Sequence, residues 1–321
     1  VTSSYVFNST TITDLNDPDG WASGSVPVGK VVTIAGSGVN AIATSLPVFA
    51  GITVQDGASL TISGDATLPA TTLADGASLT ISSGSATVGG ALTIEASASS
   101  LASVSVASGA TLNVPGGTAF KNCSLALNGT LAATSDGKLI FGTANDGETT
   151  HFSMTANGAT IPALNSAGTE NGSRLDFAVP ASGGTVVVDA PIVLKDTTIT
   201  YNNKDGMAFG LNNPNAQAFE VIADNTPLEI GANTYVAGGA NLVLTNNTVL
   251  LRKRHSAGDT GDSFYNIYVQ NRGKITLVDS GEIRAGITRV NGDTTNGVIE
   301  VNPDEAGWVG IEVLSGGIGC W

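Results

Sequence analysis

The sequence has 321 residues, of which 41 are glycine, 5 % are aromatic and only 12 % are charged, and its formal net charge is −14. Ordinary domains carry about 25 % charged residues, and long helices draw on Leu, Glu and Lys, so this composition excludes a helical protein. A positive mean hydropathy excludes intrinsic disorder, and the negative charge argues against nucleic-acid binding, which needs clustered Lys and Arg. Because the sequence begins at Val1 without a signal segment, we expect a processed, exported chain.

Residues 1–30 are expected to form an N-terminal cap. An oxygen-rich turn within this segment has the density of ligands found in calcium loops, and its candidate Ca²⁺ ligands are Asp14, Asn16, Asp17 and Asp19. An EF-hand frame that starts at Asp14 places Pro18 at its fifth position and Ser25 where a bidentate Glu belongs. A plain Asx/Pro turn is therefore the favoured interpretation, and Ca²⁺ is the only cofactor considered.

A short motif, Gly-Ala-Ser/Thr-Leu-x-Ile/Val, repeats along the chain. Copies begin at Gly57, Gly76 and Gly109, a shorter one begins at Gly90, and weaker ones continue as far as Gly273. Each copy reads as a turn followed by a short strand, in which Leu60 and Ile62 point to one face and Thr61 to the other. Stacked turns would align equivalent residues and bury one continuous inner column.

Residues 31–300 are therefore predicted to form an all-β, single-stranded right-handed parallel β-helix, a β-solenoid of roughly 14 coils. The alternative is one β-sandwich or two, which are also built from short strands separated by turns. The β-helix is favoured, because a sandwich gives no reason for a strand motif to recur with the same glycine offset.

The repeats, together with the opening run from Gly20 to Pro27 that leads into Val31–Ile34, resemble right-handed parallel β-helices of bacterial surface proteins, such as autotransporter passengers and adhesin-like repeat proteins. The resemblance implies this fold and an extracellular, cell-surface location. It implies no specific activity, since function resides in sites rather than in folds.

Charge is distributed unequally along the chain. There is no Lys or Arg between Val31 and Phe120, whereas seven of the 13 basic residues fall between Arg252 and Arg289. Cations beside carboxylates and aromatic rings suit an acidic polysaccharide, although a solvated strand and turn is the favoured interpretation. The candidate binding residues are Arg252, Arg254, His255, Asp259, Asp262, Tyr265 and Tyr268.

Residues 301–321 are expected to form a C-terminal cap or a segment that joins subunits. The three tryptophans lie close to the chain ends, where a solenoid must cover its open core and its unpaired strand edges. The residues expected to cap or join the ends are Trp21, Trp308, Cys320 and Trp321. Cys123 is expected to lie in the core, too far along the rod to form a disulfide with Cys320.

The sequence thus predicts an extracellular structural or adhesive protein that associates with itself through its ends, with glycans or neighbouring surface proteins as further partners. It predicts neither nucleic-acid binding nor a membrane span. The alternative is a polysaccharide lyase or glycoside hydrolase of the pectin-lyase-like kind, with its active face around Arg252–Arg272. No paired Asp residues and no other catalytic motif support that alternative, so no catalytic residue is assigned.

Overall fold

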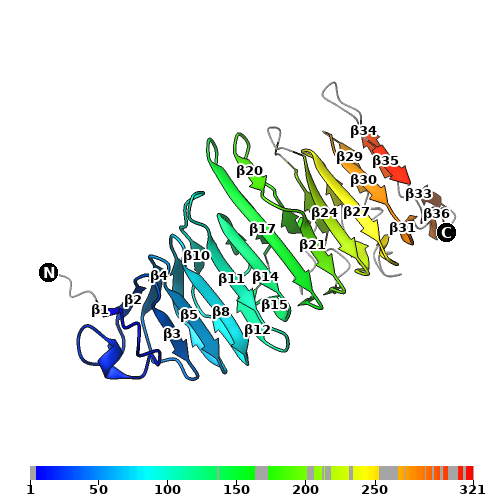
Figure 1. Ribbon diagram of the computed structural model, residues 1–321. Helices are drawn as coiled ribbons and strands as arrows, with labels where there is room; N and C mark the ends of the chain where they lie inside the picture. Colours follow the sequence, from blue (N-terminus) through cyan, green and yellow to red (C-terminus); the bar gives the residue numbers. More distant parts are fainter. Residues whose placement is uncertain are drawn as a thin grey trace.

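The computed structural model describes residues 5–135, 137–162, 173–200, 206–211, 213, 218–230, 234–252, 267–270, 272–285, 287–290, 293–296, 299–302, 310–313 and 316–320. In this part of the chain the protein is almost entirely β-strand, with one short 3₁₀ helix, η1 (Pro18–Gly20). Nearly all strand pairs are parallel, and the exception is the antiparallel hairpin of β32 (Ile287–Val290) and β33 (Asp293–Asn296). The prediction of an all-β protein with parallel sheets is confirmed (Figure 1).

One sheet, called sheet 1, follows the chain from its N-terminal to its C-terminal region (Figure 1). It has 12 strands, of which β20 (Thr185–Val188) lies off the main path beside β17. The main path, in order, is β3 (Asn40–Ala43), β5 (Ser59–Ser63), β8 (Ser78–Ser83), β11 (Ala102–Val106), β14 (Cys123–Leu127), β17 (Thr149–Asn157), β21 (Ile192–Lys195), β24 (Phe219–Asp224), β27 (Ala240–Thr245), β30 (Lys274–Leu277) and β35 (Gly310–Val313).

The second face is divided between two sheets. Sheet 2a has five strands: β1 (Tyr5–Phe7), β2 (Val31–Ala35), β4 (Gly51–Gln55), β7 (Ala70–Leu73) and β10 (Leu92–Ile94). Sheet 2b has seven: β13 (Ala119–Phe120), β16 (Leu139–Phe141), β19 (Ser173–Phe177), β23 (Gly206–Phe209), β26 (Thr234–Val236), β29 (Ile267–Gln270) and β34 (Ile299–Asn302).

The third face is divided in the same way. Sheet 3a has six strands: β6 (Ala66–Leu68), β9 (Ser85–Val88), β12 (Thr111–Val114), β15 (Thr130–Ala133), β18 (Thr160–Ile161) and β22 (Thr198–Ile199). Sheet 3b has four: β25 (Leu228–Ile230), β28 (Val249–Arg252), β31 (Gly281–Ala285) and β36 (Gly316–Cys320). Strands β35 and β36 carry sheets 1 and 3b into residues 301–321.

Successive strands visit the three faces in turn. Thus β7, β8 and β9 lie in sheets 2a, 1 and 3a, and β10, β11 and β12 repeat the order; one such pass is called a coil. Partners on neighbouring strands of sheet 1 are 19 residues apart at Asn40 and Ser59 but 38 apart at Thr155 and Val193. The coils therefore vary in length, and later ones are longer than the spacing between Gly57 and Gly76 indicates. The main path of sheet 1 has 11 described strands, against the roughly 14 coils predicted. The motif itself precedes strands on all three faces, because Gly57 leads into β5, Gly90 into β10 and Gly109 into β12.

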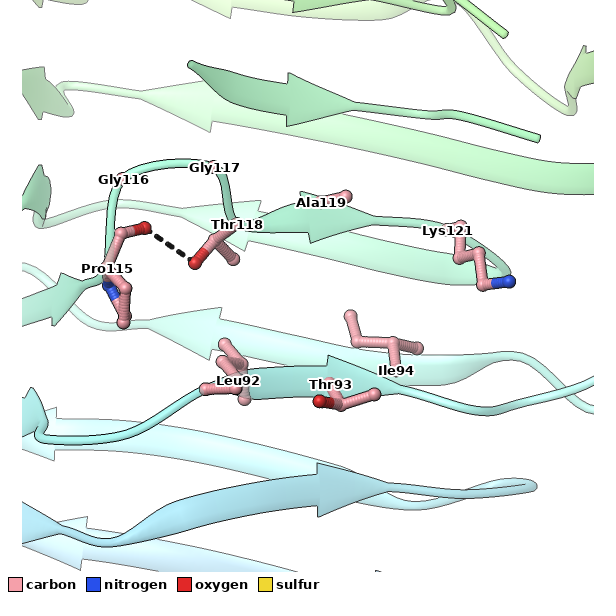
Figure 2. Close-up of a pocket in the computed structure, with 10 residues that line it drawn as sticks. Leu92, Thr93, Ile94, Pro115, Gly116, Gly117, Thr118, Ala119 and Lys121 are labelled. Carbon is pink, nitrogen blue, oxygen red and sulfur yellow. Dashed lines mark hydrogen bonds between the residues drawn. The ribbon is translucent and has the colours of Figure 1, made fainter. Parts of the chain in front are cut away.

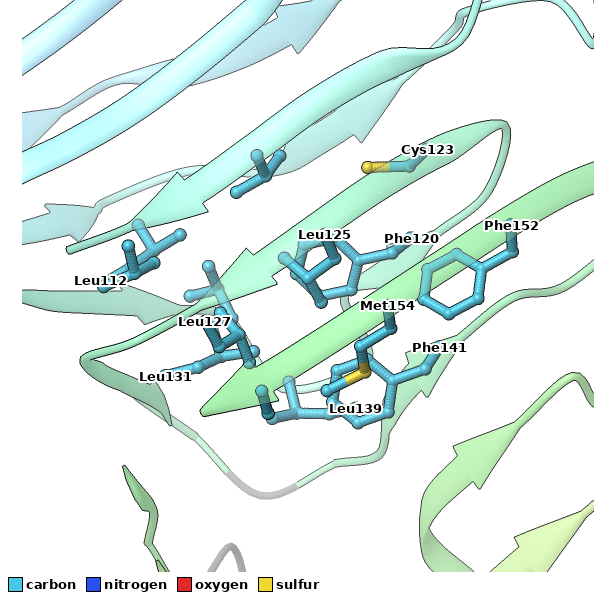
Figure 3. Packing of buried hydrophobic residues seen from close by; sticks show 14 of the residues in the cluster. Leu112, Phe120, Cys123, Leu125, Leu127, Leu131, Leu139, Phe141, Phe152 and Met154 are labelled. Atoms are coloured by element: carbon cyan, nitrogen blue, oxygen red, sulfur yellow. The ribbon is translucent and has the colours of Figure 1, made fainter. Parts of the chain in front are cut away.

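Alternating side chains fill the interior, as the strand pattern predicts. Leu60 and Ile62 are fully buried and lie in register with Leu79 and Ile81 of the next coil. Four phenylalanines stack through four consecutive strands of sheet 2b, with ring centroids 5.9, 5.0 and 5.1 Å apart: Phe120, Phe141, Phe177 and Phe209. Figure 3 shows part of this core, including Phe120 and Phe141. Such pairs contribute about 0.5–1.5 kcal/mol each beyond the area they bury.

Several corners that follow strands of sheet 1 use a left-handed backbone, which glycine, aspartate or asparagine supplies. Gly109 (φ 76°) and Gly158 (φ 63°) do so in the first half of the chain. Later corners use Asp196 (φ 49°) and Asn225 (φ 46°), which tolerate this region better than other side chains. The side-chain amide of Asn225 also donates to Asp196 Oδ1 at 2.7 Å, so a hydrogen bond joins these two corners of neighbouring coils.

Buried threonines supply hydrogen bonds just beyond these corners. Thr197, Thr226 and Thr248 are at most 1 % exposed. The Thr197 amide donates to Thr226 Oγ1 at 3.1 Å, and the Thr226 amide donates to Thr248 Oγ1 at 3.0 Å. Hydroxyl groups thus satisfy main-chain donors where the chain leaves one sheet and enters the next.

Candidate functional site

A surface groove lies where the second face is interrupted (Figure 2). Strand β10 ends sheet 2a and β13 begins sheet 2b, and within residues 91–121 no ladder joins the two strands. The cavity between them has a volume of about 300 Å³. Its lining comes from β10, from the loop before β13 and from β13 itself: Ala91, Leu92, Thr93, Ile94, Pro115, Gly116, Gly117, Thr118, Ala119 and Lys121.

Main-chain groups of both strands face the groove. The Glu95 amide donates to Leu73 O and Ala91 O accepts from Thr71, so residues 91, 93 and 95 bond toward β7. Alternate residues of a parallel strand bond to opposite neighbours, so the peptide groups of Leu92 and Ile94 point toward β13. By the same alternation, Thr118 O and Phe120 O accept from β16, and the peptide group of Ala119 points toward β10.

The loop before β13 borders the interruption. Pro115 has no amide hydrogen to contribute to a ladder, and Gly117 has φ 89°, a left-handed value. The Thr118 hydroxyl donates to Pro115 O at 2.7 Å, which holds the loop closed on itself (Figure 2).

One ion pair lies at the end of the groove. Lys121 Nζ is 3.1 Å from Glu148 Oε1, and both side chains are about one-third exposed. The pKa of Glu148 lies below its usual value, mainly because the Asn145 amide donates to its carboxylate and further because Lys121 lies beside it, while partial burial opposes the shift. At neutral pH the carboxylate is thus charged and holds the ammonium in place.

The groove can hold a small polar ligand or ordered water through these main-chain groups, the Thr93 hydroxyl and Lys121. Its ten lining residues include no Asp, Glu or His, so the groove does not supply a general acid and base.

A second interruption lies on the third face, between β22 and β25. It contains a cavity of about 310 Å³ lined by Asp196, Thr197, Thr198, Ile199, Asn225 and Pro227. Pro227 directly precedes β25 and, like Pro115, cannot donate to a ladder. A proline thus lines each cavity and precedes the strand that begins the next sheet, four residues before β13 and directly before β25.

A third polar site lies on the outer side of sheet 1. His151 Nδ1 is 2.7 Å from Asp189 Oδ1, and the two side chains are about one-third exposed. The His151 amide donates to Asn122 Oδ1 at 2.9 Å, so neighbouring coils hold this residue from both sides. The pair is a positioned imidazole and carboxylate.

Most of the binding residues predicted near the C-terminal third lie outside the described residues, namely Arg254, His255, Asp259, Asp262 and Tyr265. Arg252 is the last residue of β28, where its backbone pairs with Ile230. Tyr268 lies in β29 in register with Tyr235 of β26, and the two rings stack with centroids 5.0 Å apart and planes 12° apart. The structure thus gives Tyr268 an aromatic neighbour that sequence reasoning missed.

The predicted calcium ligands take part in turn hydrogen bonds. Asp14 Oδ1 accepts from the amide of Asn16 at 2.9 Å and from its side chain at 3.2 Å. Asp17 Oδ1 accepts from the Asp19 amide at 3.0 Å and caps η1. These are Asx-type contacts, in which carboxylate oxygens support the turn itself. Among the residues that the structure describes, no three His, Cys, Asp or Glu side chains converge on a metal position.

The expected end residues are described only in part. Trp21 is 3 % exposed, packs edge-on against Phe7 with ring centroids 5.3 Å apart, and donates to Leu15 O at 3.0 Å. Its ring therefore lies inside this chain. Cys320 belongs to β36, while Trp308 and Trp321 lie outside the described residues.

Cys123 lies in the core, as predicted. It is free and fully buried, and burial raises the pKa of its thiol to about 12.

Sequence reasoning missed the groove between β10 and β13, the pair of His151 and Asp189, and Tyr235. Only the groove has a local signal, the run Pro115-Gly116-Gly117, which reads as a turn wherever it occurs. The other two depend on residues that lie in different coils.

No helix in the described ranges combines the length and hydrophobicity required to cross a bilayer. Comparison of the chain with protein-family models, curated proteins and solved structures finds no match in any of the three.

Proposed function

We propose that this chain is a single right-handed β-helix, exported to the cell surface, where it serves as a structural or adhesive scaffold. The observation that carries the proposal is the continuity of sheet 1, whose main path joins strands from β3 to β35. Ten strand spacings of about 4.8 Å correspond to a rod of about 48 Å. A chain that returns to the same three faces gains length with each coil, which suits a spacer that projects from a surface.

The distribution of side chains supports the same function. The outer positions of the first coils carry small polar residues such as Thr33, Thr53 and Thr72, which lie in register on sheet 2a. Neither cavity combines clustered carboxylates with aromatic rings, which would favour an enzyme that acts on polysaccharides.

Self-association would use the ends of the rod. At the N-terminal end the core is covered by Phe7, Leu15 and Trp21, each at most 3 % exposed. At the other end, β34, β35 and β36 are the last strands of sheets 2b, 1 and 3b. Strand edges pair with further strands unless charge or a covering segment blocks them, so the proposed contact between subunits is a contact between rod ends.

Electron microscopy of the purified protein over a range of concentrations tests the proposal. We expect single rods about 48 Å long at low concentration and end-to-end assemblies at high concentration. Display of the chain on a non-adherent bacterium, followed by a count of cells retained on polysaccharide-coated or protein-coated surfaces, tests adhesion. Globular particles would refute the rod. Release of unsaturated or reducing sugars from a polysaccharide, without retention of cells, would identify the enzyme instead.

A further inference from the structure

The outer side of sheet 1 carries two aligned rows of hydroxyl groups. In strands β5, β8, β11, β14 and β17, the core-facing residues Leu60, Leu79, Val104, Leu125 and Met154 are at most 1 % exposed, so the residues on either side of each point outward. Nine of these ten outward positions are Ser or Thr, and the tenth is Ala126. We call the nine residues the hydroxyl array: Ser59, Thr61, Ser78, Thr80, Ser103, Ser105, Ser124, Ser153 and Thr155.

The array is a two-dimensional lattice. Neighbouring strands place equivalent hydroxyls about 4.8 Å apart, and residues two apart in one strand are about 6.6 Å apart. Hydrogen bonds along one row fix the hydroxyls, since Ser103 Oγ donates to Ser78 Oγ at 2.8 Å and Ser153 Oγ to Ser124 Oγ at 3.1 Å. Each of these hydroxyl oxygens retains acceptor capacity for an outside partner.

The surroundings of the array restrict the kind of ligand. A hydroxyl that exchanges one water for another hydrogen-bonding partner gains little net free energy, so a dissolved polymer would not repay its loss of conformational freedom here. Sites for sugars normally add aromatic stacking, yet the part of the chain that carries strands β5, β8 and β11 has no aromatic residue from Gly51 to Ala119 and no cation from Val31 to Phe120. In β17 the outward ring of His151 is held by Asp189. A solid ligand loses no conformational entropy when the array binds to it, because its surface groups are already held on a lattice.

We propose that the hydroxyl array binds ice. The spacing across the strands is close to the oxygen repeat along the a axis of hexagonal ice, so ordered water on the array can continue the crystal. Outside the array, the in-register threonines Thr33, Thr53, Thr72 and Thr93 form a single further row on sheet 2a with the same strand spacing. Binding through the hydroxyl array adsorbs the rod to a growing crystal and slows its growth at that point.

The test measures the partition of the intact, fluorescently labelled chain between slowly growing ice and the remaining liquid, together with inhibition of ice recrystallisation. We expect enrichment in ice for the wild type. Thr80→Lys and Ser105→Lys each place a long charged side chain in the centre of the array and should lower the partition toward that of an unrelated acidic protein. The matched control is Thr67→Lys, which adds the same charge at an exposed position of β6 on the third face and should partition like the wild type.

Two further measurements separate a damaged surface from a damaged fold. All variants should keep the wild-type melting temperature and circular dichroism, and Ala126→Thr, which completes the array, should increase the partition into ice. Exclusion of the wild-type chain from ice would overturn the proposal, as would equal loss in Thr67→Lys and Thr80→Lys. Binding to crystalline cellulose or chitin that Thr80→Lys abolishes, without adsorption to ice, would also overturn it and assign the array to a solid polysaccharide. None of these outcomes depends on whether the chain forms end-to-end assemblies.

Discussion

The hydroxyl of Thr226 satisfies hydrogen-bonding groups that water does not reach. Thr226 is fully buried, and its Oγ1 accepts from the Thr197 amide at 3.1 Å and donates toward Leu194 O at 2.9 Å. Thr226→Val keeps the shape of the side chain but replaces this hydroxyl by a methyl group. The Thr197 amide is then left without its acceptor.

The expected cost follows from that orphaned amide. A buried donor without a partner costs about 1–3 kcal/mol, and the added methyl group recovers less than about 1 kcal/mol because the site has no new apolar space. Thr198, which follows Thr197 in the chain, is exposed, and its main-chain amide donates to Ala159 O. Thr198→Val is therefore the matched control, with an expected change within about 0.5 kcal/mol.

Native-state hydrogen exchange is the suitable assay, because stacked coils need not unfold in one step. We expect protection of the Thr197 amide to fall about 5- to 150-fold in Thr226→Val, which corresponds to about 1–3 kcal/mol. The amides of the first coils should be unaffected. Unchanged protection of Thr197 in Thr226→Val, or an equal fall in Thr198→Val, would refute the role given to the buried hydroxyl.

Three further predictions follow from single sites. Gly84→Ala should lower the melting temperature more than Gly109→Ala. Both glycines have left-handed φ values, but a Cβ at Gly84 would meet a neighbouring carbonyl carbon at 2.5 Å, whereas one at Gly109 would meet nothing within 4 Å. Equal losses of melting temperature would argue against the close approach of the coils at Gly84. Glu148→Gln should remove a small, salt-sensitive stabilisation of the folded state. This stabilisation is present above the usual carboxyl pKa of about 4.5 and is lost as the pH falls through the lower pKa that Glu148 has in the folded protein. The free energies of unfolding of variant and wild type, measured by urea titration, should therefore converge in acid. In a Cys320→Ser background, Cys123 should resist alkylation at pH 8 until the protein unfolds, because a buried thiol with a pKa of about 12 supplies almost no thiolate; rapid labelling of the native protein would contradict its burial.

The sequence predicts a good part of the fold because the relevant signals are local. Alternation places Leu60 and Ile62 inside and Thr61 outside whichever strand pairs with theirs. Glycine-rich turns indicate where strands begin, and the burial of Cys123 fits its alternation with Leu125 and Leu127 along one strand.

Other features depend on which coil lies beside which. His151 and Asp189 are 38 residues apart, and Tyr235 meets Tyr268 because β26 pairs with β29. Loops at the corners absorb insertions, so coil length varies and no fixed period predicts these partners.

The sequence by itself determined the class of the protein: an all-β chain of short alternating strands with little charge. Those properties depend on residue types and on spacings of two or three positions. Only the tertiary structure decided that unequal coils bring Ser and Thr residues into two straight rows on sheet 1, and that β10 and β13 leave a groove between them. The physical reason is that hydrogen bonding between coils sets the register, and register determines which outward side chains become neighbours.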